Sequence, residues 1–292
     1  MAATLTACIV NLFATVLLVC GLHMGVVGAA LGTVLAQAAA VGLLLCWRMA
    51  DDGGATMRIG AAAPPPTRAE ASAWLRFGLP LGVAQLTRVL NIAMVTAAAS
   101  SAGVHACAAH QIGVSLFYLW CPFGDTASQA AQTFVPATSL AVRTRLIRHL
   151  LVLAAAAGMT TAALCLLPIR IPAILAIFTT DQQIIAATVG VLPLVGLCVL
   201  AYPLAAALEG VMIAERDGQF IARTYACMPA VTGGVIWGLG RLGLGAVDAA
   251  WVGFNAFQGA RLVAYSGRRW QQRRQCGRDC ACPSMTTLRH EC

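Results

Sequence analysis

Long runs of apolar residues, separated by short charged segments, dominate the chain. Charge-poor windows bounded by Gly and Pro predict eight helices, each of the ~20 residues needed to cross a bilayer. They lie near residues 3–22, 26–47, 77–100, 104–124, 149–168, 185–208, 220–239 and 246–265. We therefore predict an all-α fold, a polytopic membrane helix bundle with about eight transmembrane helices.

The composition agrees with this pattern. Of the 292 residues, 59% are hydrophobic and only 10% are charged, whereas an average soluble domain has about 25% charged residues. No Asp, Glu, Lys or Arg occurs between Met1 and Arg48. This composition excludes a water-soluble globular protein and indicates an integral, multi-pass membrane protein whose main partner is the lipid bilayer.

The positive charge is distributed unevenly among the loops. The net charge is +8, and all 19 basic residues are Arg. In every second loop, the basic or histidine residues are limited to His23, Arg170 and Arg241. The other loops and the tail are rich in arginine: Arg48, Arg58, Arg68, Arg76, Arg143, Arg145, Arg148, Arg216, Arg223, Arg268, Arg269, Arg273, Arg274 and Arg278. The positive-inside rule then places both termini on the cytosolic or equivalent side. No basic patch alternates with stacking aromatics, so we expect no nucleic-acid partner.

A Pro- and Gly-rich segment divides the chain. We expect residues 1–49 to form two helices of one lobe, 50–73 a linker, 74–266 a six-helix lobe and 267–292 an Arg- and Cys-rich tail. The segments 25–30 and 245–250 are similar at an offset of 220 residues. Two explanations remain open, namely a parallel repeat of two halves, as in many transporters, and chance similarity of Ala- and Gly-rich helices.

Cysteine is abundant, with 12 residues. Those in or beside apolar spans are interpreted as small hydrophobic residues: Cys8, Cys20, Cys46, Cys107, Cys121, Cys165, Cys198 and Cys227. The tail holds the rest beside His290: Cys276, Cys280, Cys282 and Cys292. The C-x3-C-x-C spacing is not an established zinc pattern, so a disordered tail is the favoured interpretation over zinc binding, and we expect no metal and no cofactor.

Polar residues deep in the third predicted span are the first candidates for a substrate cavity. Gln85, Arg88 and Asn91 follow i, i+3, i+6 spacing and share one broad helical face. An unpaired arginine at this depth costs at least ~2.5 kcal/mol on insertion scales, so it needs a wet cavity or a partner. Arg88 therefore either binds an anionic or polar substrate or pairs with a carboxylate such as Asp125 or Glu209.

Other polar residues are candidates for the cavity or for ion coupling. Gln111 and Gln132 are further cavity candidates. His110 is a candidate proton relay, because its ordinary pKa is near neutrality, or else a hydrogen-bond donor at a helix end. Asp125 and Glu209 are expected at inner helix ends, where they act as coupling or gating groups or form local ion pairs with Arg148 or Arg216.

Several stretches resemble the multidrug and toxic compound extrusion (MATE) transporter family. Asn11, residues 24–34 and Gln37 resemble its fifth and sixth helices, and Phe77-Gly78-Leu79-Pro80 resembles the start of the seventh. Further matches are 108–112, 124–136, 178–181, Leu208-Glu209-Gly210 and Arg216-Asp217. The stretches 128–136 and 208–210 are most similar to the branch related to DNA-damage-inducible protein F and its plant and algal plastid members.

The resemblance implies a function as well as a fold. Family members have twelve helices in two lobes, and this chain would begin at the fifth, which implies a truncated copy or an incomplete gene model. The implied activity is secondary export of a small organic compound, an organic anion or xenobiotic, in exchange for protons or sodium by alternating access. The plastid envelope is the implied membrane, with plasma or other organelle membranes as alternatives.

Two other functions remain open. One is a lipid or lipid-linked flippase of the same superfamily, and the other is a membrane fragment without transport activity. The chain contains no phosphate-binding G-x-x-x-x-G-K-[ST] loop, H-E-x-x-H or G-x-S-x-G motif. We therefore expect no enzyme activity and no ATP-driven pumping.

Overall fold

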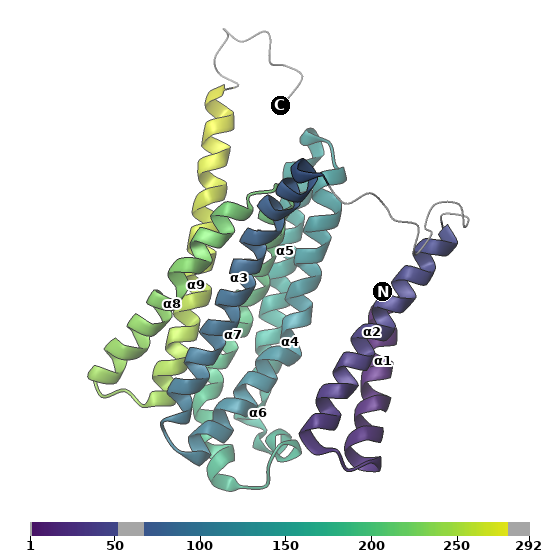
Figure 1. The fold of residues 1–292 in the computed structure, drawn as a ribbon. Helices are drawn as coiled ribbons and strands as arrows, with labels where there is room; N and C mark the ends of the chain where they lie inside the picture. The colour runs from purple at the N-terminus through teal and green to yellow at the C-terminus, as the bar shows by residue number, and fades with distance from the viewer. Residues whose placement is uncertain (1, 52–66, 280–292) are drawn as a thin grey trace. The chain divides into compact units, whose positions relative to one another are not determined.

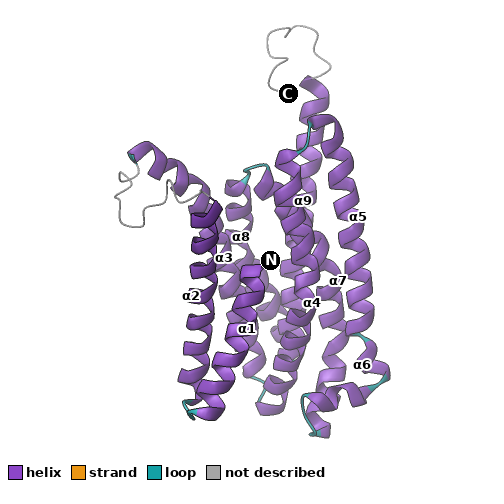
Figure 2. Ribbon diagram, turned by 90° about the vertical axis from the view of Figure 1, so that its right-hand side faces the viewer, coloured by secondary structure: helices purple, strands orange, loops and turns teal. Residues whose placement is uncertain are grey.

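The computed structural model describes residues 2–51 and 67–279, and the elements in these ranges are helices joined by turns, with no strand among them (Figures 1 and 2). Most of the predicted linker, and Cys280, Cys282, His290 and Cys292 of the tail, lie outside these ranges. The chain divides into two compact units, residues 1–69 and 70–292. The all-α membrane fold predicted from the sequence is confirmed.

The first unit is a helical hairpin. α1 spans Ala2–Val16 and ends in a π-helical turn, Leu17–Gly21, and α2 spans Gly25–Asp51. The backbone reverses through His23 and Gly25, which adopt φ of 53° and 54°. Gly32 allows the two helices to approach each other, because a Cβ at this position would lie 2.5 Å from Thr15 Oγ1.

The second unit is a bundle centred on α7. Its elements are α3 (Arg68–Ser100), α4 (Val104–Ala137), α5 (Leu140–Cys165), α6 (Leu167–Arg170), a 3-10 helix (Pro172–Ile177), α7 (Gln182–Ala214), α8 (Gly218–Arg241) and α9 (Ala246–Asp279). α7 packs against α4, α5 and α9, and α8 packs against α9 (Figure 2).

Four described segments are long and apolar enough to cross a membrane: Gly25–Trp47, Arg68–Ser100, Val142–Arg170 and Gln182–Ala214. Leu5–Gly21 is apolar but shorter. The three remaining predicted spans coincide with α4, α8 and α9, which are long helices. The sequence pattern therefore located the helices correctly.

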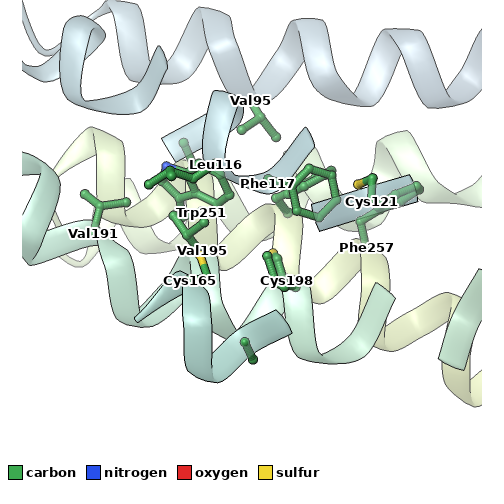
Figure 3. Close-up of a cluster of buried hydrophobic side chains, with 14 of the residues drawn as sticks. Val95, Leu116, Phe117, Cys121, Cys165, Val191, Val195, Cys198, Trp251 and Phe257 are labelled. Atoms are coloured by element: carbon green, nitrogen blue, oxygen red, sulfur yellow. The ribbon is translucent and has the colours of Figure 1, made fainter. Parts of the chain in front are cut away.

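Aromatic and sulfur-containing side chains fill the core of the second unit. Trp251 and Phe257 of α9 lie beside Phe117 of α4 in the cluster of Figure 3. Phe254 bridges them, with ring centroids 5.2 Å from Phe117 and 5.7 Å from Phe257. Three of the cysteines interpreted as small hydrophobic residues are buried in the same core: Cys121, Cys165 and Cys198.

Several helices are longer than the sequence pattern indicated: α3 and α5 begin earlier than expected, at Arg68 and Leu140, and three helices end well past their expected ends. α4 continues from the expected end at 124 to Ala137, α7 from 208 to Ala214, and α9 from 265 to Asp279. The predictions that Asp125 and Glu209 lie at helix ends are therefore wrong, and part of the predicted tail is helical. A charged residue ends a hydropathy window, but it does not end a helix whose backbone hydrogen bonds continue.

Candidate functional site

Four polar side chains from four different helices meet inside the second unit. Arg88 comes from α3, Glu209 from α7, Tyr225 from α8 and Arg261 from α9. We call these four residues the Arg–Glu cluster. Tyr225 and Arg261 are buried, with exposures of 0% and 1%, whereas 31% of the Arg88 side chain is exposed. Arg261 is therefore enclosed by protein, whereas Arg88 is accessible from outside the cluster.

Glu209 is the common acceptor of the cluster. Arg88 Nη2 donates to Glu209 Oε1 at 2.9 Å, and the Tyr225 hydroxyl donates to Oε2 at 2.9 Å. Arg261 Nη2 also donates to Oε2. The Tyr225 hydroxyl in turn accepts a hydrogen bond from Arg88 Nη2 at 2.6 Å. Gln258 Oε1 accepts from Arg261 Nη1 at 2.7 Å, which fixes the buried guanidinium.

The cluster carries an excess of positive charge and of donors. Two guanidinium groups face one carboxylate, so its formal charge is one positive unit. The buried Nε atoms of Arg88 and Arg261 have no hydrogen-bond partner among the described residues. Aromatic faces compensate part of the charge, since the Arg261 guanidinium carbon lies 5.1 Å from the ring centre of Tyr225 and 5.3 Å from that of Phe257.

A cavity of about 230 Å³ adjoins the cluster. A second carboxylate, Asp125 of α4, faces the same space, and its Oδ1 accepts a hydrogen bond from the Tyr202 hydroxyl at 2.6 Å. Polar and apolar groups share the wall, which is formed by Leu81, Ala84, Gln85, Arg88, Asp125, Ser128, Gln132, Tyr202, Ala206, Glu209, Ile213 and Arg261. Such a mixture can orient a small ligand with a charged head and an apolar body.

Glycines bring α4 and α7 together beside this cavity. A Cβ at Gly210 would lie 2.5 Å from the Ser128 carbonyl oxygen, and one at Gly124 would lie 2.9 Å from Pro203 Cα. The close approach places Ser128 and Asp125 of α4 on the same wall as Glu209 of α7. Small residues at helix crossings serve this purpose in membrane bundles.

The structure brings together five of the residues that the sequence singled out. Gln85, Arg88, Gln132, Asp125 and Glu209 all line the cavity. Of the two partners considered for Arg88, the structure pairs it with Glu209. The expected local pairing of Glu209 with Arg148 or Arg216 is wrong, because its partners come from α3 and α9.

Three other sequence candidates lie elsewhere. Asn91 is fully buried, and its Oδ1 accepts a hydrogen bond from Thr232 at 2.6 Å. His110 is buried against the Trp251 ring and lies 3.2 Å from the Thr96 hydroxyl. Gln111 is exposed on α4. Asn91 therefore does not share the cavity-facing side of α3, because at about 100° per residue it is offset by about 120° around the helix from Gln85.

Sequence reasoning missed Arg261 and Tyr225. Arg261 lies near the end of the last predicted span, 246–265, and was not named as a candidate, but it is 1% exposed in the middle of α9. The available signal was an arginine inside an apolar segment, the same signal that identified Arg88. Tyr225 gave no such signal, because tyrosine carries no charge and is common at the ends of membrane helices, where it indicates no buried site.

A second group of ion pairs ties three elements at one end of the bundle. Glu215, in the α7–α8 turn, forms an ion pair with Arg143 of α5 at 3.1 Å and accepts a hydrogen bond from Arg269 of α9. Asp217 accepts from Arg268 at 2.8 Å. Three of the arginine-rich segments that the sequence assigned to one side of the membrane therefore meet at one end of this unit.

The fold and the buried charged cluster define a multi-pass helical membrane protein of the MATE transporter fold. A MATE in the straight conformation superposes with a TM-score of 0.77 at 16% identity, covering 92% of this chain and 61% of that one. The MATE transporter ClbM in complex with Rb+ gives a TM-score of 0.67 at 17% identity, covering 91% and 59%. These likenesses establish the fold.

Sequence comparison points to the same family. The chain is 24% identical over 196 residues to Protein DETOXIFICATION 47, chloroplastic, of Arabidopsis thaliana, covering 65% of this chain and 35% of that protein. No family model matches. The chain thus spans about a third of this relative and about 60% of the solved MATE chains. The resemblance seen in the sequence motifs is confirmed.

Proposed function

We propose that the chain acts in secondary active export of a small organic compound, an organic anion or xenobiotic, in exchange for protons or sodium. The observation that carries the proposal is the Arg–Glu cluster beside a polar cavity, inside a bundle with the MATE fold. Ionisable residues inside membrane bundles are costly and mark substrate or ion pathways. Alternating access would expose this cavity to each side of the membrane in turn.

Asp125 is our first candidate for the coupling group. Its carboxylate lines the cavity and accepts one hydrogen bond from Tyr202, whereas Glu209 is engaged by two arginines and a tyrosine. A carboxylate with fewer partners keeps more lone pairs free to bind a cation. His110 is less suitable, because it is buried between Thr96 and Trp251 and does not line this cavity.

We further propose a plastid envelope as the membrane. This proposal depends on the name of the chloroplastic relative, which shares 24% identity with the chain. Expression of the full chain with a C-terminal fluorescent tag in plant or algal cells would test it. Fluorescence confined to the plasma membrane would contradict it.

Transport should depend on Arg88. In inverted vesicles that contain the full chain, an imposed proton or sodium gradient is expected to drive uptake of radiolabelled benzoate, a small organic anion. Arg88→Gln removes the positive charge and should lower initial uptake by at least about tenfold, which corresponds to the loss of roughly 1.4 kcal/mol of binding. Uptake is compared at equal protein level and equal gradient.

Arg143→Gln is the matched control, because Arg143 also binds a glutamate but lies outside the cavity. It should leave uptake within about twofold of the wild-type rate. No gradient-dependent uptake of benzoate or of cationic test compounds by the wild-type chain would contradict transport by this chain. Equal uptake by wild type and Arg88→Gln would contradict the role of the cluster.

A further inference from the structure

Glu209 occupies a position that a ligand anion would otherwise fill. Its two carboxylate oxygens accept from Arg88 on one side and from Arg261 on the other. In this geometry the two arginines form an anion site, and Glu209 is its internal occupant. Arginine is suited to this role, because its planar group binds carboxylates through more than one N–H.

The anion site is not fully used by Glu209. The cluster keeps one positive charge, and the part of the chain that the structure describes offers no partner to the buried Nε atoms of Arg88 and Arg261. Arg261 is 1% exposed and still contributes to the cavity wall. The uncompensated positive charge favours a ligand that brings an anionic group to the exposed side of Arg88.

The cavity also sets the size of the ligand. Its volume of about 230 Å³ is below the ~300–1,000 Å³ typical of sites for drug-sized ligands. Gln85, Ser128 and Gln132 can donate hydrogen bonds from the wall, and Leu81, Ala206 and Ile213 supply apolar surface. These features fit a small monoanion with one carboxylate head and a compact apolar body.

We propose that Glu209 competes with the carboxylate of such a monoanion for Arg88, so that the ligand displaces Glu209 from Arg88 while Arg261 retains it. The proposal rests on the proposed function for its biological meaning and extends it to the chemistry of binding. Arg88 is the exchangeable partner because 31% of its side chain is exposed, whereas Arg261 is enclosed. Arg88 therefore binds the ligand, and Arg261 positions Glu209.

Binding of two isosteric probes to the purified full chain in detergent micelles tests the competition. Benzoate and benzamidinium have similar shape and opposite charge, and their dissociation constants are measured by calorimetry. We expect the wild type to prefer benzoate. Glu209→Gln should bind benzoate about tenfold more tightly, because a like charge near the ligand is removed, and Arg88→Gln should bind it at least about tenfold more weakly.

Two further variants separate competition from misfolding. Asp125→Asn removes a second carboxylate that faces the cavity, and it should also tighten benzoate binding, by about threefold. Glu215→Gln is the matched control, because Glu215 also forms ion pairs with two arginines but lies outside the cavity. It should leave both dissociation constants unchanged. Thermal unfolding of each variant establishes that it is folded.

The result that would overturn the proposal is weaker benzoate binding in folded Glu209→Gln or Asp125→Asn, or a wild-type preference for benzamidinium. If Glu209→Gln does not fold, the benzoate affinity of Asp125→Asn is used instead, and weaker binding again contradicts the proposal. The assay requires no ion gradient and no flux. Tighter benzoate binding without uptake in vesicles would therefore support the competition and contradict only the proposed transport.

Discussion

Replacing Glu209 with Leu should destabilise the protein by about 3–5 kcal/mol, the usual cost of removing one partner from a buried ion pair. The substitution leaves Arg88 and Arg261 facing each other with no carboxylate between them, and Arg261 is 1% exposed. It also removes the acceptor of the Tyr225 hydroxyl. The measurement is the free energy of unfolding of the purified chain in mixed micelles, obtained from a denaturant titration.

A double variant tests whether the cost comes from unpaired charge. Glu209→Leu combined with Arg261→Met replaces the buried pair with apolar residues, and it should recover at least half of the lost free energy. Such pairs are often replaced by hydrophobic residues with little loss. A Glu209→Leu protein as stable as the wild type, or a double variant less stable than the single one, would show that the pair does not hold the bundle together.

Gly210→Ala should destabilise the protein by about 2 kcal/mol through overpacking. The new Cβ would lie 2.5 Å from the Ser128 carbonyl oxygen and 2.7 Å from Ser128 Cα, and both of these neighbours are backbone atoms of α4. The two helices must therefore separate at the level of the cavity. The same unfolding titration measures the loss, and a lower affinity for benzoate should accompany it.

Gly190→Ala provides the control within the same helix. A Cβ at Gly190 of α7 meets nothing within 4 Å. Alanine is the better helix former by about 1 kcal/mol, so this variant should be as stable as the wild type or slightly more stable. Equal losses in the two variants would indicate a general effect of changing α7 rather than the contact with Ser128.

The sequence identified site residues best where a charged residue interrupts an apolar helix. A buried arginine in an apolar helix stands out, so Arg88 could be found, and Glu209 could be named as one of its two possible partners. Arg261 carries the same signal but lies near the end of its predicted span, and hydropathy does not show that this part of α9 is buried. The choice between Asp125 and Glu209 required the arrangement of α3, α7 and α9 in space.

Helix ends were harder to predict for a related reason. The windows 104–124 and 185–208 ended just before a carboxylate, yet Glu209 is followed by another turn of α7 because its charge is paired with residues from other helices. The three-dimensional pairing thus makes a charged residue compatible with a helix interior. Tyr225 and Gln258 could not be identified from the sequence, because their roles depend on the hydrogen bonds that they form with Glu209 and Arg261.

The two sets of ion pairs should respond differently to the surrounding solution. Glu215 and Asp217 bind arginines at one end of the bundle, where Arg143 and Arg268 are 28% and 36% exposed. Raising the ionic strength from 0.15 to 1 M shortens the Debye length from about 8 Å to about 3 Å and weakens such pairs, whereas buried pairs are screened much less. Salt would thus loosen the ties among α5, the α7–α8 turn and α9 at this end while the Arg–Glu cluster holds the interior.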